Sequence, residues 1–186
     1  MTTRRGFLIS TLALASTPVV ARGATLGTAP VVRIITEAIC ADTRNFARHF
    51  GIHSGNGEDS AECLFELERE LIDNKLDRIF GLTRASTQFL VQQTAASYGY
   101  QTTYQGQHQY ESEQLTHSLE GSRASIDIAA KRLTHHDGAW AAELADAMSV
   151  LGDSDALSEQ RVFTLASDIP NDSSRHLVSW MLRSVS

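Results

Sequence analysis

The pattern of polar and apolar residues changes in the stretch YQTTYQGQHQYESEQLTHSLE, residues 100–120. From 100 to 111 the even positions hold Tyr, Thr, Gly or His, while the odd positions hold Gln, Thr or Glu. From 114 to 119, Leu and His alternate with Gln, Thr and Ser. Strict alternation of this kind indicates β-strands with one face turned to water. The stretch therefore predicts two strands.

A hairpin that joins the two strands must keep both half-apolar faces on one side of the sheet, because a shift of one residue moves every side chain to the other face. The connecting loop must then have an even length. This condition pairs Tyr110 with Leu115 and His108 with His117.

The rest of the chain shows apolar residues at helical spacing. This spacing predicts helices over residues 30–50, 58–80, 83–97, 125–134, 139–151, 157–166 and 174–184. The helix over 83–97 is expected to bury Ala85, Phe89, Leu90 and Ala96. The predicted fold class is α+β: a predominantly helical single domain with a small antiparallel β-hairpin or sheet at about residues 100–120.

The first residues have the features of an export leader. Two arginines, Arg4 and Arg5, precede an interrupted apolar stretch over 7–20, which is too short and too polar to span a membrane. Residues 3–8 (TRRGFL) resemble the twin-arginine signal consensus. The resemblance implies that the twin-arginine export machinery carries the folded chain to the periplasm or outside the cell. An ordinary secretory signal that carries two arginines is the alternative.

Cleavage is expected near residues 21–24, so residues 1–24 form the signal peptide and residues 25–186 a single soluble α+β domain. Export of folded cargo often accompanies a cofactor or a partner subunit, but the leader names neither. No second apolar segment is long enough to cross a bilayer, so the mature protein is not expected to be membrane-embedded.

The charge of the chain argues against nucleic acid as a partner. Its 16 basic and 22 acidic residues give a net charge of −6, and cleavage after residue 21, which removes Arg4 and Arg5, makes it −8. Phosphate binding depends on Lys and Arg, and the chain has no basic run.

The two cysteines, Cys40 and Cys63, are predicted to form a disulfide, because the predicted compartment is oxidising. Thiolate metal ligands or a redox pair are the alternatives, but the close C-x-x-C spacing is missing.

The strongest chemical hypothesis concerns His108 and His117. Opposed residues on adjacent strands have Cβ atoms roughly 5 Å apart, so both imidazoles could reach one metal ion or ligand. Tyr104 and Tyr110 flank them. A metal site needs a third ligand, for which His135, His136 or an acid is available. The competing interpretation is that the histidines and tyrosines pack and hydrogen-bond inside the domain.

No established catalytic or cofactor motif is found in the sequence. The leading hypothesis is a small exported, non-enzymatic binding or accessory protein that holds a small ligand, a metal ion or a partner subunit. The alternative is a small metal-dependent hydrolase that uses His108 and His117. A structural or stress protein of the cell envelope is a third hypothesis.

Overall fold

The computed structural model describes residues 7–13, 31–37, 39–52, 60–73, 76–111, 113–134, 139–151, 159–166 and 176–185, with the backbone alone for 7–13 and 60–63. The elements follow in the order β1 (Phe7–Ala13), β2 (Val31–Glu37), α1 (Ala41–His49), α2 (Ser60–Ile72), β3 (Arg78–Thr83), α3 (Ala85–Ala96), β4 (Tyr100–Glu111), β5 (Gln114–Gly121), α4 (Arg123–Thr134), α5 (Trp140–Ser149), β6 (Glu159–Ala166) and β7 (His176–Ser184).

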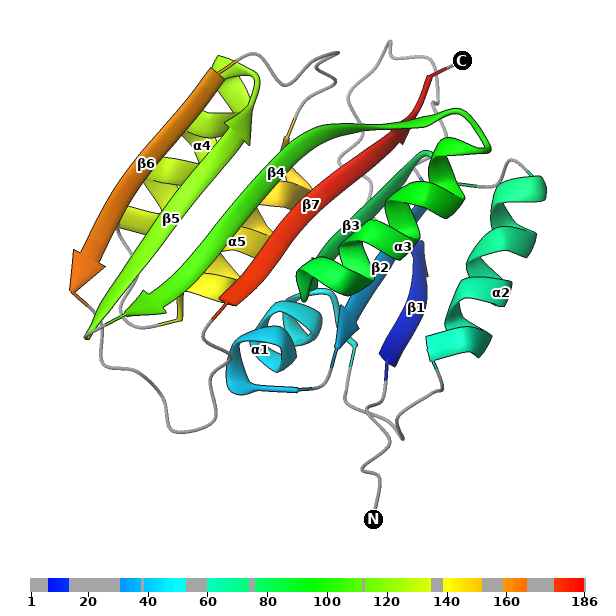
Figure 1. Cartoon of the computed structure of the whole chain (residues 1–186), viewed down its shortest axis with the longest axis horizontal. Coiled ribbons are helices and arrows are strands. Elements are labelled where there is room, and N and C mark those ends of the chain that lie inside the picture. Colours follow the sequence, from blue (N-terminus) through cyan, green and yellow to red (C-terminus); the bar gives the residue numbers. More distant parts are fainter. Residues whose placement is uncertain are drawn as a thin grey trace, which may run out of the picture.

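The strands form one mixed sheet in the order β1-β2-β3-β7-β4-β5-β6 (Figure 1). β2 and β3 run parallel, and the other neighbouring strands are antiparallel. A parallel pair needs a crossover connection, and the chain between β2 and β3 contains α1 and α2. β7, the last strand of the chain, enters the sheet between β3 and β4.

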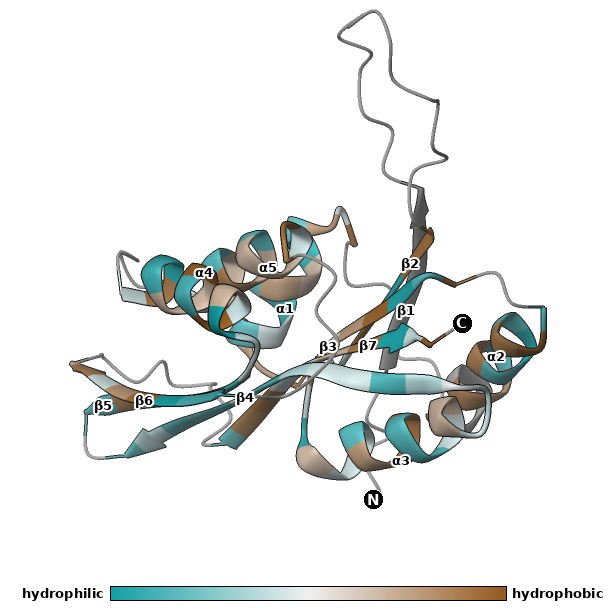
Figure 2. Ribbon diagram, turned by 90° about the horizontal axis from the view of Figure 1, so that it is seen from above, coloured by the Kyte–Doolittle hydropathy of each residue, from teal (hydrophilic) through white to brown (hydrophobic). Residues whose placement is uncertain are grey.

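Helices cover both faces of the sheet, but not along its whole width (Figure 2). α1, α4 and α5 lie on one face, and α2 and α3 lie on the other. We call the two resulting clusters the first core, which contains Phe46, Trp140 and Leu144, and the second core, which contains Leu67, Val91 and Trp180. The second core does not extend to β5 and β6 within the described residues.

The prediction of a predominantly helical fold is wrong. Three segments predicted as helix, over 30–50, 157–166 and 174–184, contain β2, β6 and β7, and a fourth, over 58–80, contains the first three residues of β3. In β2 and β7, nearly every residue from the second onward is buried. A strand covered on both faces reads as a continuous apolar run, so the alternation that identifies a strand is absent from its sequence.

The hairpin prediction is confirmed. β4 and β5 pair antiparallel with Tyr110 opposite Leu115 and His108 opposite His117. The loop between them has two residues, and Glu113 in it has φ 63°, in the left-handed region that tight turns use. Burial alternates along β5, which confirms one wet face.

The predicted buried face of α3 is wrong. The helix buries Thr87, Gln88, Val91 and Ala95, while Phe89 is 60% and Leu90 48% exposed. Val91 and Ala95 pack into the second core, and on the same side of the helix the Thr87 hydroxyl donates a 2.7 Å hydrogen bond to Glu37 of β2.

The predicted disulfide is not present in this structure. Cys40 is a buried free thiol at the N-cap of α1, with its Sγ 3.6 Å from the Thr43 hydroxyl. It belongs to the first core, whereas α2, the helix that contains Cys63, packs through Leu67 and Leu71 into the second core. The sheet lies between the two helices, because they cover opposite faces (Figure 2).

Part of the predicted leader forms the edge strand β1, which pairs antiparallel with β2 from Phe7 opposite Glu37 to Ala13 opposite Val31. Cleavage near 21–24 would remove β1 and leave β2 at the edge of the sheet. None of the helices in the described part of the chain has the length and apolar character needed to cross a bilayer.

Candidate functional site

The two histidines of the hairpin project from the same side of the sheet into the first core. His108 is 1% and His117 0% exposed. Their ring centroids are 4.9 Å apart, and the two Nδ1 atoms are 2.7 Å apart, which is a direct hydrogen bond. The strand parity predicted from the sequence thus places the imidazoles side by side.

Ser179, a residue of β7, extends this pair into a chain of three groups. Its Oγ lies 2.8 Å from Nε2 of His108, and the residue is fully buried. If the serine hydroxyl donates to Nε2, then Nδ1 of His108 carries its proton and donates to His117. If Nε2 donates to the serine instead, every bond in the chain reverses. Both arrangements satisfy both nitrogens of His108.

Glycine is required next to the hydrogen-bonded side chains of Ser179 and His108. Gly106 lies opposite Ser179 in the pairing of β4 with β7. A Cβ atom at Gly106 would lie 2.5 Å from the Ser179 hydroxyl and 3.1 Å from Nε2 of His108. A side chain at this position would therefore separate the serine from the histidine.

Aromatic rings enclose the two imidazoles. The ring of Trp140, the first residue of α5, has its centroid 4.5 Å from that of His108, and Phe163 of β6 packs 5.2 Å from His117. The Trp140 indole donates a 2.9 Å hydrogen bond to the hydroxyl of Tyr110. Tyr104 is buried in the same core. All four residues proposed from the sequence therefore belong to one region of the first core.

Burial in this region changes the acidity of its groups. Desolvation lowers the pKa of His108 well below its usual value, and the neighbouring His117 and His176 lower it further. His108 is consequently neutral at pH 7. Burial raises the pKa of the Tyr104 phenol, and the nearby Ser179 hydroxyl opposes only part of that rise. The lowered pKa of His108 and the raised pKa of Tyr104 have the same cause: an apolar environment disfavours the charged form of each side chain.

A metal site would require a wider separation of the two imidazole nitrogens and at least one further ligand. Two nitrogens bound to one tetrahedral Zn²⁺ lie about 3.3 Å apart, so the Nδ1 atoms would have to separate from their direct hydrogen bond. Among the described residues, no three His, Cys, Asp or Glu side chains gather in a way that could hold an ion. His135 and His136, the proposed third donors, lie outside the described residues.

The bonding order of Ser179, His108 and His117 is that of a nucleophile, a base and an orienting group. In such triads Nε2 of the base faces the serine and Nδ1 faces the third group, as it does here. All three side chains are buried in this structure, so a substrate would have to displace part of the covering helices to reach Ser179. No sequence pattern pointed to Ser179, because its segment was predicted as helix.

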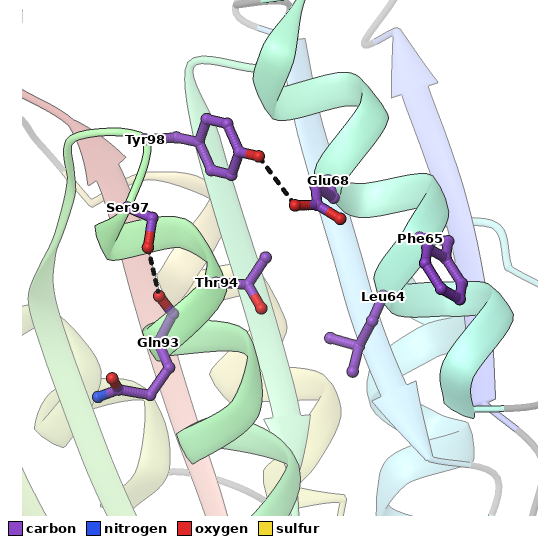
Figure 3. Close-up of a pocket in the computed structure, with 7 residues that line it drawn as sticks. All are labelled: Leu64, Phe65, Glu68, Gln93, Thr94, Ser97 and Tyr98. Carbon is purple, nitrogen blue, oxygen red and sulfur yellow. Dashed lines mark hydrogen bonds between the residues drawn. The ribbon is translucent and has the colours of Figure 1, made fainter.

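A separate groove opens on the other side of the molecule, between α2 and α3 (Figure 3). It has a volume of about 640 Å³. Its walls are formed by Leu64, Phe65, Glu68, Gln93, Thr94, Ser97 and Tyr98. The Tyr98 hydroxyl donates a 2.9 Å hydrogen bond to Glu68 across the groove, and this bond, with the carboxylate charge, raises the pKa of Tyr98.

Large apolar side chains are exposed on the two helices that form this groove. Phe65 is 72% and Ile72 61% exposed on α2, and Phe89 and Leu90 are exposed on α3. Phe65 lines the groove, whereas Ile72, Phe89 and Leu90 lie elsewhere on the same two helices. Single exposed apolar residues are common on protein surfaces, but several of them on two adjacent helices are typical of a contact surface. The helical periodicity of the sequence does not show this, because it places Phe89 and Leu90 inside.

Comparison with known proteins finds no family model, no characterised protein and no solved structure that this chain matches. Its function is therefore argued from its own residues.

Proposed function

We propose that this chain is a small exported, non-enzymatic binding or accessory protein, and that it holds its ligand or partner on the surface formed by α2 and α3. The observation that carries the proposal is the set of four large apolar side chains, Phe65, Ile72, Phe89 and Leu90, exposed on the two helices that form the groove. A concave surface that combines apolar side chains with polar groups is a usual form of a binding site.

The chemistry of the groove limits what it accepts. Among the described residues, its walls combine apolar side chains with amide and hydroxyl groups, and Glu68 is the one charged residue. A phosphate or other polyanion would meet Glu68 with no compensating cation among these described wall residues. The surface therefore suits an apolar molecule or the apolar side of another protein.

Export by the twin-arginine route is supported by the leader sequence. We expect Arg4→Lys combined with Arg5→Lys to leave the chain in the cytoplasm, because the arginine pair is the part of the leader that resembles the recognised signal. Cell fractionation measures this. Normal export of the double variant would leave the ordinary secretory route as the explanation.

Binding of a neutral, environment-sensitive dye tests the surface. We expect saturable fluorescence with the wild-type chain and about tenfold or greater loss of affinity with Phe65→Asp, because burial of a phenylalanine side chain provides more than the 1.4 kcal/mol that corresponds to tenfold. Val162→Asp is the matched control, since Val162 is 60% exposed on β6. Equal loss in both variants would argue against a site at this surface.

The second candidate is a hydrolase built on His108 and His117, and the bond between His108 and Ser179 is the observation that favours it. A metal-dependent enzyme would show stoichiometric metal that is lost when both histidines are replaced by alanine. A serine enzyme would react with a fluorophosphonate probe, and Ser179→Ala would abolish the labelling. A chain that holds no metal and does not react with the probe would leave the two histidines as packing residues.

A further inference from the structure

Three glutamates of α2 differ in the groups that neutralise them. Arg33 of β2 forms ion pairs with Glu66 at 3.2 Å and with Glu70 at 2.9 Å. Glu68 lies between these two in the sequence, but its side chain is on the wall of the groove. Among the described residues, no cationic side chain forms an ion pair with Glu68, and its one hydrogen-bond partner is the Tyr98 hydroxyl. Glu68 is therefore a carboxylate whose charge no described cation compensates.

Neither helix beside the groove supplies the missing positive charge. On α2, the residues one turn before and after Glu68 are Leu64, Phe65 and Ile72, all apolar. Arg69 is next in the sequence, but successive residues of a helix do not face each other. On the other wall, none of the 12 residues of α3 is Asp, Glu, Lys or Arg. The groove therefore presents one negative charge bordered by apolar side chains, and a cation on the ligand is the electrostatic complement of that charge.

The hydrogen bond across the groove leaves two acceptors for such a cation. Glu68 and Tyr98 point toward each other, and Leu64 and Thr94 project into the space between their helices (Figure 3). The Tyr98 hydroxyl donates to Oε1 of Glu68 at 2.9 Å, and this contact raises the pKa of Tyr98, so the phenol keeps its proton. The lone pairs of the phenol oxygen remain available. So does Oε2 of Glu68, which accepts no hydrogen bond within the described part of the chain.

A primary ammonium ion matches these two acceptors. It has three donors that point in separate directions, so it can donate to Oε2 of Glu68 and to the phenol oxygen of Tyr98 at once. A guanidinium ion binds best to two free oxygens of one carboxylate, and Tyr98 already occupies one of them. A chain of apolar carbon atoms on the ammonium would lie against Leu64 and Phe65, which line the same groove. The volume of about 640 Å³ is typical of sites for small organic ligands.

We infer that the groove binds a primary ammonium ion that carries an apolar chain, with Glu68 and Tyr98 holding the charged end and Leu64 and Phe65 holding the chain. This inference rests on the proposed function, because it names the class of ligand that the α2–α3 surface holds. The proposed function requires an apolar ligand or partner, and the inference adds one positive charge to it. The net charge of −6 attracts cations to the protein from a distance, and Glu68 determines where they bind.

Calorimetric titration of the full chain with octylammonium and with octanol tests this inference, because the two probes share a chain and differ in charge. We expect octylammonium to bind about tenfold more tightly, as for a hydrogen bond to a charged group. Glu68→Gln keeps the shape of the side chain and removes its charge. It should weaken octylammonium binding about tenfold and leave octanol binding unchanged, which also shows that the variant is folded. Tyr98→Phe removes one acceptor and should weaken octylammonium binding about two- to tenfold.

Glu111→Gln is the matched control, because it makes the same change in net charge at an exposed position at the end of β4. It should leave the affinities for both probes unchanged. Equal affinity of the wild-type chain for octylammonium and octanol would overturn the inference and leave the proposed function standing. Equal weakening of octylammonium binding by Glu68→Gln and Glu111→Gln would also overturn it, because overall charge would then be the cause. A chain that binds neither probe nor the neutral dye would overturn the proposed function as well.

Discussion

The middle and the far end of the sheet differ in how they are covered. β7 lies in the middle and contributes Leu177 and Met181 to the first core and Val178 and Trp180 to the second. β5 contributes Leu115 and Leu119 to the first core, while its other side faces outward with residues such as Thr116 and Ser118. A strand covered on both sides depends on two cores, and a strand covered on one side depends on one.

The largest expected effect is at the doubly covered middle. Trp180 is fully buried, packs against Gly81 of β3 where no side chain could fit, and donates a 3.0 Å hydrogen bond to Thr83. We expect Trp180→Ala to reduce the free energy of unfolding by about 3–5 kcal/mol, because it opens a large cavity. Phe163→Ala, at a half-buried position of β6, should have a smaller effect in the same urea titration. Equal losses would mean that burial on both sides does not increase the contribution of a strand to the free energy of unfolding.

The hairpin should make the chain sensitive to acid. The pKa of His108 is lower in the folded protein than in the unfolded chain, where it is about 6.5. The unfolded state therefore binds the proton more tightly. The contribution of neutral His108 to the stability of the folded protein is complete above pH 6.5. It is lost as the pH falls, by about 1.4 kcal/mol per pH unit until the pKa of His108 in the folded protein is reached.

His108→Gln should remove this contribution, since glutamine stays neutral and still offers a donor and an acceptor. Urea unfolding of both proteins between pH 8 and pH 5 measures the difference. Parallel pH profiles for the two proteins would show that His108 is not the group responsible.

The same substitution on a covered and on an uncovered side gives a direct comparison. Thr116 and Thr164 share a 3.0 Å hydrogen bond on the outward side of β5 and β6. We expect Thr116→Ala to reduce stability by about 0.2–1 kcal/mol, as for other cross-strand pairs. Thr87→Ala should have a larger effect, about 1–3 kcal/mol, because it leaves the buried Glu37 without the hydroxyl that it accepts from. The reverse order would contradict the described burial.

The smallest expected effect is that of a reducing agent. Cys40 belongs to the first core, and the helix that contains Cys63 packs into the second. We expect the melting temperature to be the same with and without reductant. A native disulfide would instead contribute about 2–4 kcal/mol, so a clear drop in the melting temperature would restore the pairing predicted from the sequence.

The strands of the hairpin could be predicted from the sequence, whereas the strands covered on both sides could not. The hairpin register was predicted, including the contact between His108 and His117, because one wet side preserves alternation along β4 and β5. β2, β7 and the first half of β3 were predicted as parts of helices, because burial on both sides replaces alternation with a continuous apolar run.

The candidate site was predicted in part. Tyr104, Tyr110 and the two histidines were identified from strand parity alone. Ser179 and Trp140 join them from segments about 70 and 30 residues away from His108 and Tyr110, and no local pattern links them. The α2–α3 surface was missed, because periodicity shows that a helix has an apolar stripe and does not show which side a neighbouring core will cover.

The sequence by itself determined the hairpin, its register and the shared side of the two histidines, because those properties depend on neighbours in the chain and on a period of two. It also determined the acidic charge of the chain. Only the tertiary structure decided that β7 enters the middle of the sheet, that Cys40 and α2 lie on opposite faces, and that Phe89 and Leu90 point outward. Each of these depends on which distant residues meet, and hydrophobic burial is non-directional, so it leaves no local trace of its partner.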